Sequence, residues 1–347
     1  MSFDQKINAF FSRYVLQYKK KYSKHYYYIY ADYVELLSLF SNENFVTIDD
    51  FLDRMEENLI LDKRFLFTNE DDEDLENETS EEENQNDLDE NRAELNDLKQ
   101  RFAESIFRVL SERSSLFGDD YPFLVEHNRV ILKDNTNLTN RNKVYLCLLL
   151  CSSLDIFKAF MPYLTTEFEV ISYHALRNFM PPHAEVKSFG KNSDYTGLAK
   201  EKIEALARDM KIEINTVAFS QISNRNRQEK GLDLIAWIPF DDATPNMLCI
   251  LCQCACEKEW NGKLAEAGRY NNYYNFHRQK PLSSLFIPYN IVGLNRKDFI
   301  RNDEISIDAI IFERKRILNY LENLDFFETL YSYRLVQKCI DYQEPVV

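Results

Sequence analysis

The 347-residue chain has little glycine, with 7 Gly against 21 Tyr and 25 Phe. This composition favours packed helices and strands over glycine-rich loops, and the length is enough to bury a sizeable core in one large domain or two. No uninterrupted apolar run is long enough to cross a bilayer. The first residues, MSFDQKINAFF, lack the basic-then-apolar form of a secretion signal. We therefore expect a cytoplasmic protein with no membrane partner.

Several common catalytic motifs are also missing from the sequence. There is no GxSxG and no P-loop, and no internal repeat period occurs. His174, His183 and His277 do not have the spacing of metal ligands. These absences exclude the usual nucleophile and nucleotide-binding constellations.

The seven cysteines are an odd number, and four of them lie between residues 249 and 256. This pattern indicates reduced core thiols and not a disulfide framework. A zinc site is the alternative for the four clustered thiols. On a strand, however, Cys252, Cys254 and Cys256 face one side and Cys249 faces the other, so this segment alone does not bring four ligands together.

Basic residues are absent between residues 70 and 90, where thirteen residues are acidic. Setting these thirteen aside takes the formal charge from -15 to -2, so the rest of the chain is able to carry local basic patches. Residues 68–91 form a low-complexity acidic segment, which predicts a disordered linker. A second hypothesis is that this linker mimics DNA and covers a basic cleft until a substrate displaces it.

The N-terminal part of the chain has the apolar spacing of helices. The pattern predicts helices over residues 3–22 and 31–40, and Thr47-Ile48-Asp49-Asp50 predicts a capped helix start. Lysines and tyrosines alternate between residues 19 and 28. They fit either a grip on nucleic acid or, as we prefer, a helix end followed by a short aromatic strand. The third helix is acidic, which indicates packing or partner binding and not base readout.

The stretch from Lys230 to Lys263 contains two apolar runs joined by a polar turn, which predicts two buried strands. Asp233 lies in the first strand and Gln253 near the end of the second. A carboxylate and an amide on neighbouring core strands are costly unless they have a partner. A hard cation such as Mg²⁺ is a suitable partner, because it takes a few oxygen ligands and keeps its other waters.

These residues resemble the motif of the PD-(D/E)XK nuclease superfamily, in which an Asp on one strand and a Glu or Gln on the next build a metal site. The strings GLD and QCACEKEW are similar to the variant found in bacterial restriction and phage-defence proteins. The resemblance covers roughly Thr165 to Tyr289. It implies an α/β (α+β) fold whose C-terminal core is restriction endonuclease-like, with a mixed central sheet flanked by helices.

The expected element order agrees with that core. A helix beginning at Thr165 comes first, then the strand candidates 186–189, 214–219 and the two motif strands, then a helix over 263–276 and a strand over 285–289. One additional helix is expected over 196–210, and Pro162 is expected to end the preceding helix. The predicted organisation of the whole chain is a helical region over 1–67, the acidic linker over 68–91, a mainly helical region over 92–164, the nuclease-like core over 165–300 and C-terminal helices over 301–347.

The resemblance also implies roles for individual residues. The metal ligands are expected to be Asp233, Glu169 on the first core helix, the side-chain oxygen of Gln253 and the backbone carbonyl of Cys254. The cofactor is expected to be Mg²⁺ or Mn²⁺. Taken alone, Glu169 has the properties of a solvated helix charge, and Asp233 and Gln253 those of polar groups satisfied by neighbouring strands.

The sequence departs from the family at the lysine of the motif, because Ala255 occupies its position. Lys258 is our first candidate for a displaced catalytic lysine, and Lys263 is the second. Lys230, with Arg225 and Arg227, forms a basic loop beside Asp233 that suits phosphate contacts.

The function implied is a Mg-dependent endonuclease that hydrolyses phosphodiester bonds of DNA in anti-phage defence or restriction, with RNA also compatible as a substrate. A companion defence protein is an expected partner. The alternative is a catalytically inactive nuclease-like fold that acts as a DNA-binding or protein-recruiting subunit of a defence complex. A third hypothesis is a scaffold whose helical first half recruits an effector protein.

Overall fold

The computed structural model describes residues 2–12, 16–17, 22, 26–58, 61, 85–224, 231–240, 242, 244, 247–263, 265–276, 279–293 and 309–343. The chain divides into two compact units. The N-terminal unit consists of Ile7–Leu138 and Lys338–Val347, and the C-terminal unit of Met1–Lys6 and Thr139–Gln337. Helices α1 (Phe3–Phe11) and α12 (Tyr331–Asp341) have residues in both units.

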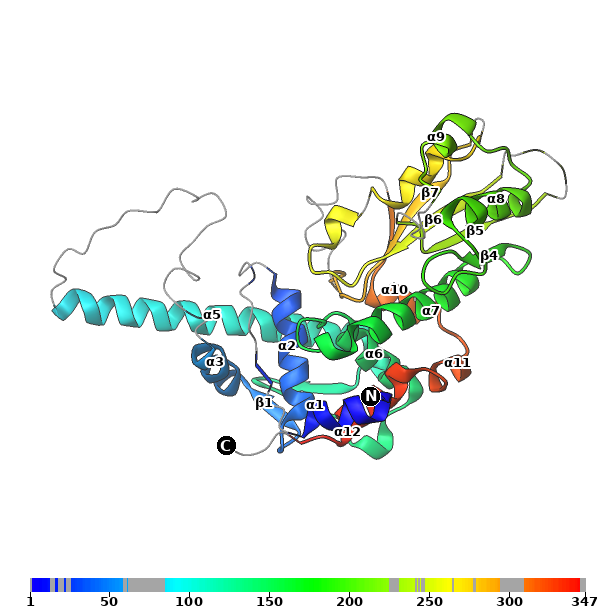
Figure 1. Cartoon of the computed structure of the whole chain (residues 1–347). Coiled ribbons are helices and arrows are strands. Elements are labelled where there is room, and N and C mark those ends of the chain that lie inside the picture. The colour runs from blue at the N-terminus through cyan, green and yellow to red at the C-terminus, as the bar shows by residue number, and fades with distance from the viewer. Residues whose placement is uncertain are drawn as a thin grey trace. The chain divides into compact units, whose positions relative to one another are not determined.

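In the described part of the N-terminal unit, three helices besides α1 and the end of α12 pack with a small antiparallel sheet. The helices are α2 (Tyr27–Phe40), α3 (Ile48–Glu57) and the long α5 (Gln85–Phe117). The strands are β1 (Phe45–Thr47), β2 (Phe123–Glu126) and β3 (Arg129–Leu132), in the order β1-β3-β2. Short 3-10 turns cover Gly118–Asp120 and Asn135–Asn137. Figure 1 shows α2 and α3 beside α5.

The predicted cap at the start of α3 is confirmed. Thr47 Oγ1 accepts a hydrogen bond from the Asp50 N–H at 3.1 Å, and Asp50 Oδ2 accepts one from the Thr47 N–H at 2.9 Å. This reciprocal pair satisfies two of the N–H groups that a helix start leaves without an intrahelical partner. The capping box formed by Thr47 and Asp50 therefore sets where β1 ends and α3 begins.

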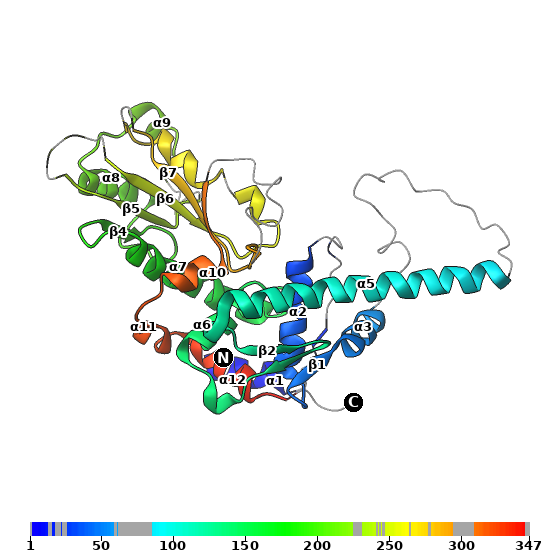
Figure 2. The same ribbon diagram turned by 180° about the vertical axis from the view of Figure 1, so that it is seen from behind.

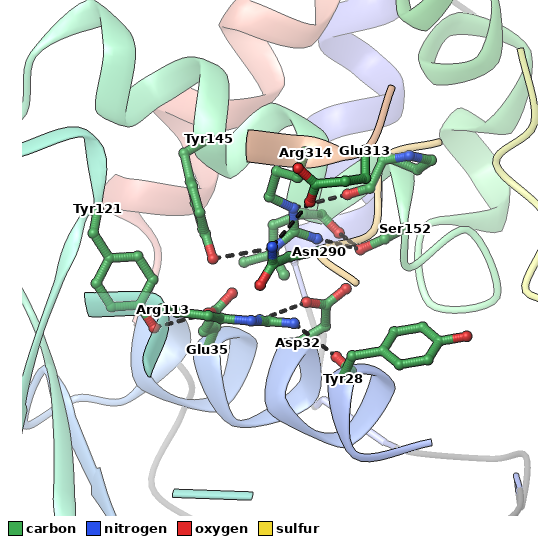
Figure 3. A network of polar contacts seen from close by, with 12 residues as sticks. Tyr28, Asp32, Glu35, Arg113, Tyr121, Tyr145, Ser152, Asn290, Glu313 and Arg314 are labelled. Atoms are coloured by element: carbon green, nitrogen blue, oxygen red, sulfur yellow. Dashed lines mark hydrogen bonds and ion pairs between the residues drawn. The ribbon is translucent and has the colours of Figure 1, made fainter. Parts of the chain in front are cut away.

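A buried arginine holds α2 and α5 together in the N-terminal unit. Arg113 is 1 % exposed, and its Nη1 lies 2.7 Å from Asp32 and 2.8 Å from Glu35 (Figure 3). Its Nη2 donates to the Tyr28 carbonyl, and the Tyr121 hydroxyl donates to Glu35. Such a charge cluster is tolerated in a core because the Arg113 cation compensates the negative charges of Asp32 and Glu35.

The C-terminal unit surrounds a five-stranded sheet with helices. Its α-helices are α6 (Asn140–Cys151), α7 (Met161–Phe179), α8 (Ala199–Met210), α9 (Thr216–Ser220), α10 (Arg314–Asn319) and α11 (Asp325–Glu328). Its strands are β4 (Glu185–Ser188), β5 (Leu234–Trp237), β6 (Cys249–Cys254), β7 (Leu282–Phe286) and β8 (Ala309–Phe312). The 3-10 helices η3 (Lys158–Phe160), η4 (Trp260–Lys263) and η5 (Ala267–Asn272) complete it.

The sheet is mixed, with the strand order β4-β5-β6-β7-β8. The pairs β4–β5 and β5–β6 are antiparallel, whereas the pairs β6–β7 and β7–β8 are parallel. The chain from β6 to β7 crosses over through η4 and η5, as a parallel connection requires. In chain order, helix α7 is followed by the antiparallel strands β4, β5 and β6, and helices α8 and α9 lie between β4 and β5. The crossover through η4 and η5 then leads to the parallel strands β7 and β8.

Alternating side chains of the central strands pack on two different helical layers. Ile235, Trp237 and Leu251 share one core cluster with residues of α8 and η5. The intervening residues point to the other face, where α7 packs along β4, β5 and β6. Both views show α8 on the opposite side of the sheet from α7 and α10 (Figures 1 and 2). Strands buried on both faces explain the continuous apolar runs in the sequence.

A second buried arginine supports the end of the sheet in the C-terminal unit. The Arg314 guanidinium donates to the Pro288 carbonyl at 2.8 Å and to the hydroxyls of Tyr145 and Ser152 at 3.1 Å each (Figure 3). Next to it, the buried Glu313 caps α10 by accepting from the Arg316 N–H. These contacts join α6, the segment after β7 and the start of α10.

The mixed α/β fold is confirmed, and most expected elements occur within a few residues of their expected places. Several expectations were wrong. The helix expected over 3–22 ends at Phe11, the expected short aromatic strand is instead the start of α2 at Tyr27, and residues 85–91 of the expected disordered linker belong to α5.

Residues 214–219 form mainly helix α9, because the Asn215 side chain accepts from the N–H groups of Val217 and Ala218 and so caps a helix. Pro162 begins α7 and does not end a helix, since proline is tolerated in the first turn. The expected helix over 263–276 is made of short 3-10 segments.

Some of the expected features lie outside the described residues. They are the acidic segment up to residue 84, most of the lysine- and tyrosine-rich segment at residues 19–25, His277 and the basic loop at 225–230. All seven cysteines are described and are free thiols. Within the described part of the chain, no helix has both the length and the apolar character needed to span a membrane.

Candidate functional site

Asp233 lies at a distortion where β5 begins. Its N–H donates to the Cys252 carbonyl, although the residue paired with Cys252 in the ladder is Leu234. Two residues therefore oppose one, which is the pattern of a β-bulge. On the other side, the Asp233 carbonyl accepts from the N–H groups of Phe189 and Gly190. The bulge turns the Asp233 side chain toward the face covered by α7.

The carboxylates of Glu169 and Asp233 come together beside Gly190. A Cβ atom added to Gly190 would lie 2.7 Å from Asp233 Oδ1 and 2.9 Å from Glu169 Oε2. Helix α7 places Glu169 there, because the preceding residue, Phe168, is fully buried and anchors the helix. Glu169 is only 6 % exposed. Its Oε2 accepts from the Lys191 N–H at 3.0 Å. The structure thus brings together two acids that are sixty-four residues apart in the sequence.

The closeness of the two acids changes how Glu169 ionises. Burial, together with the negative charge of Asp233, raises the pKa of Glu169 from 4.5 to about 7, although Lys191 opposes the shift. A carboxyl group with this pKa is partly protonated and partly ionised near neutral pH. Two adjacent carboxylates that resist being charged together are a common setting for a bound cation, which removes the repulsion.

Gln253 lies on β6 and is directed to the other layer. Its neighbour Leu251, two residues earlier and on the same face, packs in the core cluster with α8 and η5. The Gln253 Nε2 donates to Glu266 Oε2 at 2.8 Å. The residue is 7 % exposed, and its Oε1 is buried and has no hydrogen-bond partner among the residues that the structure describes. A buried acceptor in this state costs about 1–3 kcal/mol unless a donor or cation satisfies it.

Glu266 and Lys263 extend the contacts of Gln253 from the crossover between β6 and β7. Lys263 Nζ lies 3.3 Å from Glu266 Oε1 and 3.9 Å from Glu257. Burial acts to raise the pKa of Glu266, but the hydrogen bonds from Gln253 and Lys263 outweigh it and the pKa is lowered. Glu266 is therefore a carboxylate at neutral pH.

Gly231 permits the close approach of Glu266 to the strand that carries Asp233. Its φ angle is +93°, and an added Cβ would lie 2.7 Å from Glu266 Cβ and 3.2 Å from Gln253 Oε1. A side chain at this position would therefore be strained and would also clash. The Gln253 oxygen therefore lies beside Gly231, in the layer that contains Glu266.

Cys254 contributes its backbone to the site. Its N–H donates to Asp233 Oδ2 at 2.7 Å, which fixes the carboxylate between the two motif strands. Burial and the nearby charges of Asp233 and Glu169 raise the pKa of the Cys254 thiol well above its usual value. The thiol therefore stays protonated, which argues against its use as a nucleophile or a metal ligand.

The two candidate lysines have different surroundings. Lys258 Nζ lies 3.2 Å from Asp155, on the segment after α6. Lys263 contacts Glu266, which is itself bonded to Gln253. Ala255, at the lysine position of the motif, is 4 % exposed, and its N–H donates to the Phe286 carbonyl. Of the two lysines, Lys263 is the one whose contacts lead to the motif residues.

The donor set fits a hard cation held mainly by two carboxylates. Within the described ranges, no three His, Cys, Asp or Glu side chains are arranged to hold a metal ion. Glu169 and Asp233 supply two carboxylates beside Gly190, whereas the Gln253 side chain, also expected to be a ligand, is directed to the other layer, beside Gly231 and Glu266. Mg²⁺ is bound in proteins by as few as one or two carboxylates, with water and substrate phosphate completing its sphere. Comparison with known proteins gave no matching family model, curated protein or solved structure.

Glu266, Gly190 and Gly231 were not singled out by sequence reasoning. Glu266 lay in a segment expected to be an ordinary helix, and its contact with Gln253 depends on the crossover geometry. The glycines carried a signal that was available, because in a chain with only 7 Gly each one is informative. Gly231 stands directly before the Leu232-Asp233 pair, where a positive φ angle is a reasonable expectation.

Proposed function

We propose that this chain is a metal-dependent nuclease that hydrolyses phosphodiester bonds of DNA with Mg²⁺ or Mn²⁺. The observation that carries the proposal is the approach of Glu169 and Asp233 beside Gly190, at one end of a mixed sheet. The element order gives further support, because α7, β4, β5, β6, the helical crossover and β7 follow the order expected for the PD-(D/E)XK core. A role in restriction or phage defence, with a companion protein, rests on the sequence resemblance.

The residues of the site match what phosphodiester hydrolysis requires. The reaction needs an activated water and neutralisation of the charge that develops on the phosphate, and a bound Mg²⁺ supplies both. Asp233 and Glu169 hold the cation, and Asp233 is oriented by the Cys254 N–H. Lys263 supplies a positive charge near Gln253, where it orients water or stabilises the phosphate.

One observation favours the second candidate function, a nuclease-like fold without activity. Ala255 is buried at the position where the family motif has its lysine, and Lys258 is paired with Asp155. A chain that retained the fold but lost this lysine would act by binding DNA or by recruiting a protein in a defence complex.

Cleavage and metal binding together distinguish the two functions. We expect the full chain to cut double- or single-stranded DNA in Mg²⁺ or Mn²⁺ but not in EDTA, and Asp233→Asn to abolish cutting. Glu213→Gln is the matched control, because it also removes one negative charge from the same unit, and Glu213 is exposed between α8 and α9. RNA of the same sequence tests the substrate class.

The same proteins are titrated with Mn²⁺ by calorimetry. Wild-type protein that binds Mn²⁺ but cuts no DNA or RNA at high enzyme concentration, with partners added, would support the inactive alternative. Wild-type protein that neither binds the ion nor cuts would contradict the proposed metal site. Loss of binding in Asp233→Asn, but not in Glu213→Gln, is the expected result.

A further inference from the structure

The loop that follows β4 is attached to both elements that carry the acids of the candidate site. The Gly190 N–H donates to the Asp233 carbonyl at 2.9 Å, next to the start of β5. The Asn192 side chain donates to the Thr166 carbonyl on α7 at 2.8 Å. Lys191, which lies between these two anchors, is therefore held directly after the glycine beside which the acids meet.

Lys191 contacts α7 through both its backbone and its side chain. Its N–H donates to Glu169 Oε2 at 3.0 Å, and its ammonium donates to Thr165 Oγ1 at 2.7 Å. Thr165 and Glu169 are four residues apart on one helix, so their Cβ atoms are neighbours on the same face, about 5–6 Å apart. The ammonium therefore lies about one helical turn from Glu169, on a side chain that is exposed to solvent.

The partner of this ammonium is electrically neutral. A hydroxyl does not balance a positive charge, and among the described residues Lys191 forms no ion pair. Lys258 and Lys263 differ in this respect, because they lie 3.2 and 3.3 Å from a carboxylate oxygen. The charge of Lys191 also reaches the acid pair, since it opposes the rise in the pKa of Glu169. An exposed ammonium without an acidic partner is suited to contact an anionic group of a bound molecule.

We propose that Lys191 binds a DNA phosphate at the Glu169–Asp233 pair. The inference rests on the proposed function, because it names the residue that contacts the DNA substrate at that site. Two carboxylates repel the negative charge of a phosphodiester, and a positive charge about one helical turn away offsets part of this repulsion. The bond to Thr165 holds the side chain in place without neutralising it, and a phosphate oxygen is a stronger acceptor that replaces the hydroxyl.

Binding of fluorescently labelled DNA to the full chain in EDTA tests the proposal without cleavage. Lys191→Met removes the charge but keeps a long side chain and the backbone bond to Glu169. We expect it to bind duplex and single-stranded DNA about 10-fold more weakly at low salt. For duplex DNA, each phosphate contact adds about 0.9 to the slope of log affinity against log salt concentration. The slope should therefore become shallower by about one contact.

Lys187→Met is the matched control for the loss of one positive charge. Lys187 is on β4, four residues before Lys191, and its Nζ lies 3.6 Å from Glu185. Its removal should change DNA affinity by less than about two-fold. Lys191→Arg keeps the charge and should bind DNA as the wild type does. Equal losses in Lys187→Met and Lys191→Met would mean that only net charge matters, and would overturn the inference.

Calorimetric titration with Mn²⁺ distinguishes a phosphate contact from a structural role of the lysine. A side chain that only positioned Glu169 would lower metal affinity when removed. A phosphate-binding ammonium near two carboxylates instead opposes the binding of a cation. We therefore expect Lys191→Met to bind Mn²⁺ as tightly as the wild type or more tightly. Weaker Mn²⁺ binding with unchanged DNA affinity would assign Lys191 to the support of the acids and overturn the inference.

The two sets of measurements separate this inference from the proposed function. A wild type that binds Mn²⁺ and cuts DNA, together with a Lys191→Met variant of unchanged DNA affinity, would contradict the inference and leave the nuclease proposal in place. A wild type that binds DNA through Lys191 but neither binds Mn²⁺ nor cuts would support the phosphate contact and contradict the nuclease. A wild type that binds no DNA would contradict both.

Discussion

The Asp233 carboxylate accepts a hydrogen bond of 2.7 Å from the N–H of Cys254, so the acid of one motif strand is fixed by the backbone of the next. The bond uses Oδ2 and leaves Oδ1 directed toward Glu169 at Gly190. One side chain therefore has two tasks. One oxygen stabilises the sheet end, and the other belongs to the candidate cation site.

Asp233→Asn and Asp233→Ala should separate these tasks. The Asn oxygen still accepts from the Cys254 N–H, whereas Ala leaves that N–H without its acceptor, at a cost of about 1–3 kcal/mol. We expect both variants to lose metal binding and cleavage. In EDTA, where no metal is bound, only Asp233→Ala should have a free energy of unfolding lower by about 1–3 kcal/mol. Urea unfolding measures the difference. Equal stability of the two variants would mean that the hydrogen bond contributes nothing to folding.

The raised pKa of Glu169 predicts a pH dependence of stability. Between pH 4.5 and about 7 the folded protein keeps a proton on Glu169 that the unfolded chain releases. The free energy of unfolding of the metal-free protein should therefore fall as the pH rises through this window. Glu169→Gln removes the titrating group, and we expect it to be more stable than the wild type by roughly 2–3 kcal/mol at pH 8 but not at pH 4.5.

This comparison uses urea unfolding in EDTA at the two pH values, with Glu185→Gln as a control for an exposed acid on β4. Adding Mn²⁺ should reverse the order at pH 8, because the ion stabilises the wild type and requires the deprotonated carboxylate. The difference in free energy of unfolding between the wild type and Glu169→Gln should change between the two pH values. The same difference at both would contradict the pairing of Glu169 with Asp233.

Gly190 should be sensitive to a single methyl group. A Cβ there would lie within 3 Å of an oxygen of each acid and 3.2 Å from the Asp233 Cα, so Gly190→Ala must displace the carboxylates. We expect a loss of about 1–3 kcal/mol in unfolding free energy and a clear loss of Mn²⁺ affinity. Gly262→Ala is the control, since nothing lies within 4 Å of its added Cβ. Unchanged metal affinity in Gly190→Ala would place the cation elsewhere.

Periodicity and capping predicted much of this fold, but not how the site residues meet. The apolar runs on either side of Pro239 to Met247 identified β5 and β6, and Thr47 identified the start of α3. The bulge at Asp233 was not predictable, because it depends on pairing with Cys252 and not on local propensity. The contact between Gln253 and Glu266 likewise depends on the path of the crossover, which the sequence shows only as a helix-like stretch.

The error at residues 214–219 has a local cause. Ile214, Val217 and Phe219 have side chains that favour strands, and this propensity suggested one. The Asn215 side chain instead accepts from two N–H groups and begins α9. Here the local hydrogen bond of a capping residue outweighed a weak preference of its neighbours, which is a general risk in assigning short segments.

Arg113 should be essential for the stability of the N-terminal unit. It is 1 % exposed and lies between Asp32 and Glu35 (Figure 3). Removing it in Arg113→Met leaves two buried acids without their cation, at a cost of about 3–5 kcal/mol. Arg129→Met removes an exposed partner of Glu126 and should cost less than about 1 kcal/mol. Thermal unfolding of both variants measures the contrast, and similar losses would contradict the role of burial.

The two lysines near the motif should differ in their effect on cleavage. Lys263 contacts Glu266, and through it Gln253, whereas Lys258 is paired with Asp155. We expect Lys263→Ala to lower the cleavage rate about 100-fold, as for loss of a group that assists proton transfer or stabilises charge. Lys258→Ala should lower stability by about 1 kcal/mol and change the rate much less. Single-turnover cleavage of DNA by both variants provides the test. A large loss in Lys258→Ala together with normal activity in Lys263→Ala would show that Lys258 replaces the lysine missing at Ala255, and that the pairing with Asp155 is broken when substrate binds.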